Sequence, residues 1–564
     1  MEAILAQLTK EELDKFEEKI DGCLPIEDLR KVPRRIAVVE ALRAYEDYLR
    51  LYSLVESKGQ SPAKLALTSK LLQDSAEFMM RWVYEYCPDS ISDADISFVK
   101  PEIYELMFRV LRTAGEYSRV WDFMSMIRRG WMQPYGRSEN VIELRTVGIS
   151  CDGPAVADSF ILSPDAPDSP VIDFSNFSPE DVVREARVRG AGTDTITYTT
   201  PVGCLSMLCK KSRLALDQIF DLDLSIDVGG YTIGDFKEFW ACLLSSTVIH
   251  MTVCQVGKGM GINQLIRVMS RRQWINQLRS ISKLPDPKLK AILTDLTYDH
   301  KASGNTLSAS SQQFFDVGND ELALSNQFVL LSNAQRNLLH VINLKKGKVH
   351  SSLRNLKESD QITRLSLLFQ RRGFEVHPRI KFGAGDIDLF VVDAADRFAL
   401  VLQLKSLKAP DRINEVANEI KELNRGIEQA NTAVAWAQSN KKLLSEKTGI
   451  ALALLDDLEI RGACLSQNTI GGGRCMQDGT PVIPQRLVGW VLENPLQRSL
   501  RECWIIADKG TWYPKLGVHY EEGDTEARLG EISIISKNSG MRPLIKWDPM
   551  HDIDVSSFAK VQGG

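Results

Sequence analysis

The sequence predicts a multidomain α+β protein with a helical N-terminal region, a mixed α/β middle region and a C-terminal α/β core. Its 564 residues leave room for about three or four domains of roughly 150 residues each. Apolar residues recur at helical spacing through most of the first 140 residues, and strand-like runs between polar loops become frequent after them. The predicted regions are 1–140, 141–350, 351–500 and 501–564.

The composition excludes several classes of protein. Hydrophobic residues make up 44% of the chain and charged residues 25%, which excludes a disordered, collagenous or mucin-like protein. The net charge of −5 gives no overall basic field, so any nucleic-acid binding must come from a local patch. The ten cysteines form no CxxC pair, which indicates free thiols in a reducing compartment.

The hydropathy pattern predicts a soluble, cytoplasmic protein with no membrane partner. The N-terminus reads as a charged amphipathic helix and not as a signal peptide. The longest apolar run, Phe239–Val256, is interrupted by Ser245, Thr247 and His250. A membrane span needs about 20 nearly uninterrupted apolar residues, so this run predicts a buried helix-to-strand segment.

The region 1–140 carries no catalytic motif. Its helical stretches include RIAVVEALRAYEDYLRLYSLV and AKLALTSKLLQDSAEFMMRWVYEY, whose apolar spacing predicts a bundle. We interpret this region as a surface for assembly, either as a homo-oligomer or with partner subunits.

The middle region contains one motif with two interpretations. VIELRTVGIS and ITYTTPVGCL read as strands, and Gly257–Gly261 is a glycine-rich turn between an apolar run and a predicted helix. Such a turn can bind phosphate through backbone N–H groups, which would make the chain a nucleotide-responsive binding protein. It lacks the glycine spacing of a dinucleotide fold and the GK[ST] of a P-loop, so a flexible turn is the favoured interpretation.

The stretch SSLRNLKESDQITRLSLLFQRRGFEV, which begins at Ser351, predicts a helix that ends at Gly373. Its apolar face includes Ile362, Leu365 and Phe369, and Glu358 falls on the same face, four positions before Ile362. A carboxylate on an apolar face is costly unless it is paired or binds a metal. Alternatively, Glu358 lies near the start of the helix, where an acid is favourable.

Two apolar runs, Ile387–Val392 and Phe398–Leu404, flank a short polar loop and predict a β-hairpin. If Val392 lies opposite Ala399, Asp388 lies opposite Gln403, and Lys405 shares a strand face with Gln403. The hairpin then gathers Asp388, Gln403 and Lys405 at one edge, and Glu358 can approach from the packed helix.

This pocket has the side chains that phosphodiester hydrolysis requires. Carboxylate oxygens hold one or two Mg²⁺ ions, which polarise the phosphate and acidify the attacking water. A lysine beside them orients the water and offsets charge that develops on the phosphate. Gln403 contributes only a neutral carbonyl as a ligand.

The motif Gly385-Asp386-Ile387-Asp388, followed fifteen positions on by Gln403-Leu404-Lys405, resembles the PD-(D/E)xK nuclease superfamily, which has the restriction-endonuclease-like fold. Mrr-type and NERD-type domains are the nearest versions, and the resemblance covers roughly residues 351–500. It implies that Asp388 binds metal, that Gln403 occupies the usual acidic position and that Lys405 is the catalytic lysine. Glu358 matches the first-helix acid loosely, and Asp386 can serve instead of, or beside, Asp388.

The resemblance further implies a hydrolase, a deoxyribonuclease that depends on Mg²⁺, with Mn²⁺ as a substitute. DNA is the expected substrate, with RNA as the alternative, and the expected setting is a bacterial restriction or anti-phage defence system. A second interpretation is a structural or regulatory subunit of a nucleic-acid complex that keeps the fold without catalysis.

The following segment, residues 411–437, predicts an amphipathic helix with Ile420, Leu423 and Ile427 inward. Lys421, Arg425 and Gln429 form a stripe beside that face, placed to contact a phosphate backbone, although a solvated stripe explains the lysine and arginine equally well. ALALLDD and IRGACLSQN read as further strands. Residues from 501 read as short strands that form a β-rich appendage or the end of the core.

Overall fold

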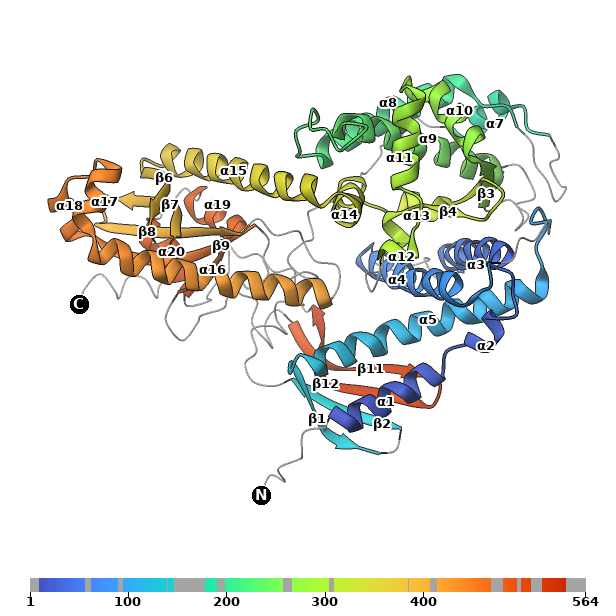
Figure 1. Ribbon diagram of the computed structural model, residues 1–564, viewed down its shortest axis with the longest axis horizontal. Helices are drawn as coiled ribbons and strands as arrows, with labels where there is room; N and C mark the ends of the chain where they lie inside the picture. Colours follow the sequence, from blue (N-terminus) through green and yellow to red (C-terminus); the bar gives the residue numbers. More distant parts are fainter. Residues whose placement is uncertain are drawn as a thin grey trace.

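The computed structural model describes residues 10–55, 62–89, 95–138, 140–146, 178–189, 198–256, 266–303, 309–383, 385–405, 413–467, 480–493, 499–508 and 520–543. Within these ranges the protein is a multidomain mixture of helices and strands, as predicted, and its strands form three separate β-sheets. A C-terminal core lies at one end of the molecule (Figure 1). The long helix α15 (Gly347–Arg371) runs from this core to the remaining helices and the two smaller sheets.

The N-terminal helices share one core with a three-stranded sheet from the middle of the chain. The helices of this core are α2 (Ile26–Leu29), α3 (Arg34–Val55), α4 (Pro62–Tyr86) and α5 (Pro101–Arg128), whereas α1 (Lys10–Gly22) packs with another sheet. The sheet has the order β3–β5–β4, with β3 (Ile266–Ser270), β4 (Phe314–Asp316) and β5 (Glu321–Ser325). Tyr45 of α3 stacks on Phe328, which follows β5, with ring centroids 4.8 Å apart. The boundary at residue 140 therefore does not separate two cores.

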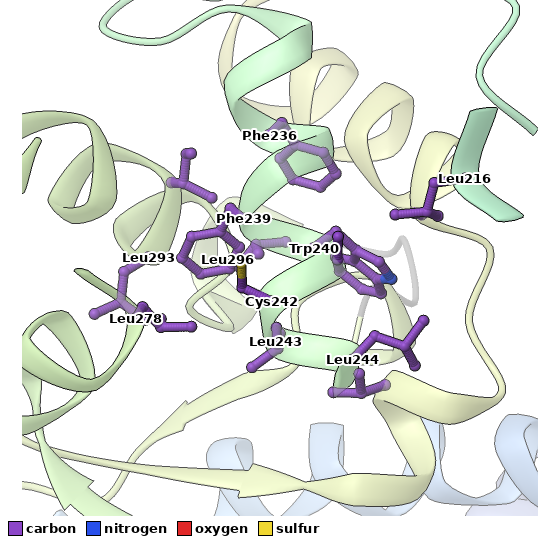
Figure 2. Close-up of a cluster of buried hydrophobic side chains, with 14 of the residues drawn as sticks. Leu216, Phe236, Phe239, Trp240, Cys242, Leu243, Leu244, Leu278, Leu293 and Leu296 are labelled. Atoms are coloured by element: carbon purple, nitrogen blue, oxygen red, sulfur yellow. The ribbon is translucent and has the colours of Figure 1, made fainter. Parts of the chain in front are cut away.

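A second core forms around the buried helix α9 (Ile233–Val256). Its neighbours are α7 (Pro179–Ala186), α8 (Val202–Ile219), α10 (Arg271–Ser282), α11 (Asp286–Asp295), α13 (Asn326–Leu330) and α14 (Ala334–Lys345). The short helices α12 (His300–Ser303) and η2 (Ala309–Ser311) contact α14 and α4 instead. Figure 2 shows Trp240 beside Leu216 of α8 and Phe239 on the side of Leu293 of α11. Side chains on several sides of α9 are buried, which explains its long apolar run.

Two expectations for this region are wrong. The run Phe239–Val256 is helical throughout and does not turn into a strand. The segment ITYTTPVGCL does not form a strand over its described residues 198–205, because 198–201 have no regular structure and α8 begins at Val202. Among the described residues, no helix combines the length and hydropathy needed to cross a bilayer.

The last two strands of the described chain share a sheet with two strands from its N-terminal part. β1 (Met132–Arg137), β2 (Val141–Thr146), β11 (Tyr520–Leu529) and β12 (Ile532–Pro543) form a sheet in the order β1–β2–β12–β11. The pairing of β12 with β2 is parallel, with Ile534 opposite Ile142. Buried residues of this sheet pack with residues of α1 and α5. In the sequence, the C-terminal core therefore lies between β2 and β11 of this sheet.

The C-terminal core is a five-stranded mixed sheet in the order β10–β9–β8–β7–β6. Its strands are β6 (Glu375–Phe382), β7 (Gly385–Asp393), β8 (Phe398–Lys405), β9 (Glu459–Ser466) and β10 (Val482–Pro484). Its helices besides α15 are α16 (Ile413–Ser439), α17 (Lys441–Thr448), α18 (Leu452–Asp457), α19 (Gln485–Glu493) and α20 (Leu500–Asp508). β6, β7 and β8 are antiparallel neighbours, and β9 and β10 continue the sheet parallel to β8.

Helices cover both faces of this sheet. α15, α19 and α20 pack on one face, and α16, α17 and α18 pack on the other. α15 ends before Gly373, whose φ of +83° suits glycine, as the sequence predicts. The runs expected to be strands at ALALLDD and at RECWIIAD are instead the helices α18 and α20.

The junction between α14 and α15 is held by charged and polar contacts. Lys345 Nζ donates to the carbonyl oxygen of Asp295 at 2.9 Å, at the C-terminal end of α11. Lys346 Nζ lies 2.5 Å from the Asp295 carboxylate, which also accepts from the Tyr231 hydroxyl at 2.8 Å. The start of α15 is therefore fixed to the helical unit, while its far half packs on the sheet.

The returning sheet leads to a stability prediction. Ile534 is fully buried between α5 and the sheet, so Ile534→Ala should lower the free energy of unfolding by about 3 kcal/mol. Urea unfolding followed by circular dichroism measures this loss. The half-buried neighbour Ile535 provides the matched control, and Ile535→Ala should cost clearly less. Equal losses for the two variants would contradict the described packing of β12.

Candidate active site

Backbone pairing between the inner strands β7 and β8 stops before one end of the sheet, which is called the Asp388 edge below. Val392 lies opposite Ala399, which confirms the register expected from the hairpin pattern. The paired register ends at Leu389 and Leu402. Asp388 and Gln403 are the next residues on each strand, at the point where backbone pairing stops.

Two side chains replace the missing backbone hydrogen bonds. Asp388 Oδ2 accepts from the backbone N–H of Leu404 at 2.7 Å, across the gap between the strands. Gln403 Nε2 donates to the carbonyl oxygen of Asp386 at 2.6 Å. Both side chains are buried, so these bonds satisfy backbone groups that would otherwise lack partners.

In β6 and β7, the alternation of side chains between the two faces of the sheet reverses at the same position. Ile387 packs on the α16 face of the sheet and Leu389 on the α15 face, although residues two apart on a regular strand share a face. The neighbouring strand reverses beside it, where Arg379 adopts a φ of +57°. A left-handed arginine is uncommon in a strand, and such backbone outliers gather at functional sites.

Burial and like charge make Asp388 a weak acid compared with an ordinary aspartic acid. The pKa of Asp388 is raised to about 6, mainly by burial and also by the nearby carboxylates of Glu358 and Asp386. The Leu404 N–H and the charge of Lys405 oppose this rise. The structure thus brings these charged groups within electrostatic range of one another, with Glu358 half-buried on α15 and Asp386 exposed at the start of β7.

Lys405 reaches the helix α16 and not a carboxylate. Its Nζ donates to Gln429 Oε1 at 2.8 Å. Within the described residues no carboxylate forms an ion pair with Lys405, so its charge is held by a neutral acceptor. Gln429 therefore touches the lysine, whereas Lys421 and Arg425, earlier in the same stripe, are exposed.

Sequence reasoning missed two residues that surround Lys405. They are Gly426 of α16 and Cys464 of β9, both buried against the lysine stem. The signal that could have found Gly426 is a glycine in the interior of a long amphipathic helix, where it costs about 1 kcal/mol relative to alanine. Cys464 carries no such signal.

The oxygen donors at this edge suit Mg²⁺ in kind. They are the carboxylates of Asp388, Glu358 and Asp386 and the amide oxygen of Gln403, whose nitrogen is engaged by a backbone carbonyl. In the described part of the chain, no three His, Cys, Asp or Glu side chains are grouped as a metal site. Mg²⁺ commonly takes one or two carboxylates and completes its shell with water and substrate phosphate.

Comparison with known proteins adds no family to this geometry. No family model, curated protein or solved structure matches the chain. The glycine-rich turn Gly257–Gly261, the basis of the nucleotide-binding alternative, lies outside the described residues.

The raised pKa of Asp388 predicts a variant that is more stable than the natural chain. Asp388→Asn should raise the free energy of unfolding by about 2–3 kcal/mol at about pH 8 without metal, because the pKa rises from an ordinary 3.8 to about 6. The folded state holds this proton more tightly than the unfolded state. The ionised carboxyl therefore costs stability as the pH rises from about 4 to above 6, and the gain should disappear below about pH 4.

Urea unfolding in EDTA at the two pH values measures this difference. Asp393→Asn removes a buried carboxyl from the other end of β7 and controls for burial alone. An Asp388→Asn gain that does not change with pH would show that the charge of Asp388 is not the cause.

The hydrogen bond of Gln403 predicts the opposite effect for an acid at that position. Gln403→Glu removes the donor to the Asp386 carbonyl and adds a carboxylate beside Asp388. We expect a loss of about 1–3 kcal/mol in metal-free buffer, the cost of an unsatisfied buried acceptor. Thermal unfolding in EDTA measures it, and an unchanged midpoint would contradict the role of this amide.

Proposed function

We propose that the C-terminal core is a metal-dependent nuclease that hydrolyses phosphodiester bonds, with DNA as its substrate. The observation that carries this proposal is the buried carboxyl of Asp388, whose pKa is raised by burial and by the charges of Glu358 and Asp386, with Lys405 also within electrostatic range. Carboxylates that repel one another in a partly buried site are the arrangement that a divalent cation compensates. The motif resemblance to Mrr-type nucleases supports DNA over RNA and the proposed role in restriction or anti-phage defence.

In this proposal Asp388 binds Mg²⁺ or Mn²⁺ with help from Glu358, Asp386 or the Gln403 amide oxygen. When bound, the cation polarises the phosphate and lowers the pKa of its water. Asp388 remains oriented by the Leu404 N–H throughout, because that bond uses only one of its oxygens.

Lys405 supplies the positive charge of the proposed site. Since its ammonium is held by the neutral Gln429 oxygen, its charge is not cancelled by a close carboxylate. It can therefore stabilise charge that develops on the phosphate or orient the attacking water. Arg425 lies one helical turn before Gln429, and Lys421 one turn before Arg425, so both exposed cations can contact the backbone of the same nucleic acid.

One observation favours a second candidate function, a nuclease-fold subunit without catalysis. Gln403 stands at the usual acidic position and its amide nitrogen bridges the parted strands. A site in which this residue serves the fold, and in which three acids are not grouped among the described residues, suits a regulatory or structural subunit of a nucleic-acid complex. This candidate predicts that replacing Lys405 leaves function intact.

Cleavage of supercoiled and linear DNA tests the proposal. With Mg²⁺ or Mn²⁺ we expect nicking or cutting that EDTA abolishes and that falls at least about a hundred-fold in Asp388→Ala and Lys405→Met, because each removes a group that stabilises the transition state. Lys442→Ala, an exposed lysine on α17, should cleave like the natural chain. Single-stranded RNA in parallel reactions separates the two substrate classes.

Metal binding separates the two candidate functions when nothing is cut. A thermal shift with Mg²⁺ that is lost in Asp388→Asn indicates a competent site that needs a partner or trigger. The absence of any shift, together with full function of Lys405→Met in the cell, would overturn the proposed nuclease in favour of the non-catalytic subunit.

A further inference from the structure

The interior of α16 has no room for a side chain at Gly426. A Cβ atom placed there would lie 2.6 Å from Cys464 Sγ and 2.8 Å from Lys405 Cε. Both distances are shorter than real Cβ contacts, so something would have to move. Lys405 and Cys464 come from neighbouring strands, and the register places Cys464 opposite Gln403.

The stem of Lys405 therefore runs between α16 and the sheet. It passes Gly426 within van der Waals distance and ends at Gln429, three residues further along the helix. Cys464 of β9 lies on the sheet side of this space, which is called the passage below. Burial raises the pKa of the Cys464 thiol to about 12, so the thiol stays neutral and does not pair with the ammonium. The passage thus fixes the path of the lysine without cancelling its charge.

We propose that Gly426 is a positioning residue for Lys405. The missing side chain opens the passage that directs Nζ to Gln429, and any larger residue displaces the lysine from the Asp388 edge. The catalytic meaning of this passage rests on the proposed nuclease function, but the passage itself can be tested without activity.

A second glycine at the interface between α16 and the sheet has close neighbours but does not contact Lys405. A Cβ at Gly462 of β9 would lie 2.9 Å from Val434 Cγ2 on the same helix. That contact is between core groups, and Lys405 is not among the nearest atoms of Gly462. Gly462→Ala therefore disturbs the packing of α16 on the sheet while leaving the path of the lysine open, which makes it the matched control.

The test uses the full chain and five variants: Gly426→Ala, Cys464→Ala, the double variant Gly426→Ala with Cys464→Ala, Gln429→Leu and Gly462→Ala. The double variant removes the sulfur that the new Cβ would meet, so the fold regains room at the strand, but the contact with Lys405 Cε remains. Circular dichroism and thermal unfolding confirm that each variant folds. The readout is the rate at which Lys405 is acetylated by an N-hydroxysuccinimide ester, measured by peptide mass spectrometry.

We expect the double variant to acetylate Lys405 about ten-fold faster than Cys464→Ala alone, the factor that corresponds to one hydrogen bond to a charged group. Gln429→Leu, which removes the acceptor directly, should give a similar increase. Gly462→Ala should acetylate Lys405 at the rate of the natural chain. Equal rates in the double variant and in Cys464→Ala would overturn the positioning role.

Cleavage assays on the same proteins connect the passage to function. If the natural chain cuts DNA, the double variant should lose kcat relative to Cys464→Ala while the KM for DNA changes little, because the exposed cations of α16 remain. If the natural chain does not cut, the proposed function fails, and the acetylation rates still decide whether Gly426 positions Lys405. A double variant that cuts as fast as Cys464→Ala would overturn the inference even where acetylation changes.

Discussion

The C-terminal core depends on a local interruption of backbone pairing. β7 and β8 pair regularly as far as Leu389 and Leu402, and beyond them the side chains of Asp388 and Gln403 satisfy the backbone groups. Buried N–H and C=O groups must find partners, so these two positions need an acceptor and a donor before any chemistry is considered. The hydrogen bond from Gln403 explains why an amide is compatible with position 403. The hydrogen bond from the Leu404 N–H orients the Asp388 carboxylate into the gap where the strands separate.

The electrostatics of the edge are unfavourable for folding, and the two hydrophobic layers of the sheet offset that cost. Asp388 is ionised only at the expense of burial and of repulsion from Glu358 and Asp386. Burial of the apolar clusters beneath α15 and α16 stabilises the fold and offsets the free-energy cost of these charges. Stability given up at a group of like charges is a common property of sites that bind a cation or a transition state.

Several contacts among the described residues join the core to the rest of the molecule, including an ion pair between Arg336 of α14 and Glu415 of α16. Lys345 and Lys346 fix the start of α15 at the C-terminal end of α11, and β12 returns to pair with β2. Because α15 also carries Glu358, the position of this acid relative to Asp388 depends on contacts made by the helical unit. The large N-terminal part is therefore in a position to influence the proposed site through α15.

The sequence by itself determined the local features of this protein. The periodicity before Gly373 defined α15 and its apolar face, and two apolar runs around a polar loop defined the β7–β8 hairpin and its register, because both patterns depend on neighbours close in the chain. Short apolar runs such as α18 and α20 were misread as strands, since length and hydropathy do not separate the two states. Only the tertiary structure decided the reversed alternation at Arg379 and Asp388, the contact of Gln429 with Lys405 and the pairing of β12 with β2. These features join residues that are remote in the sequence or depend on the space between packed elements, and no local pattern encodes that space.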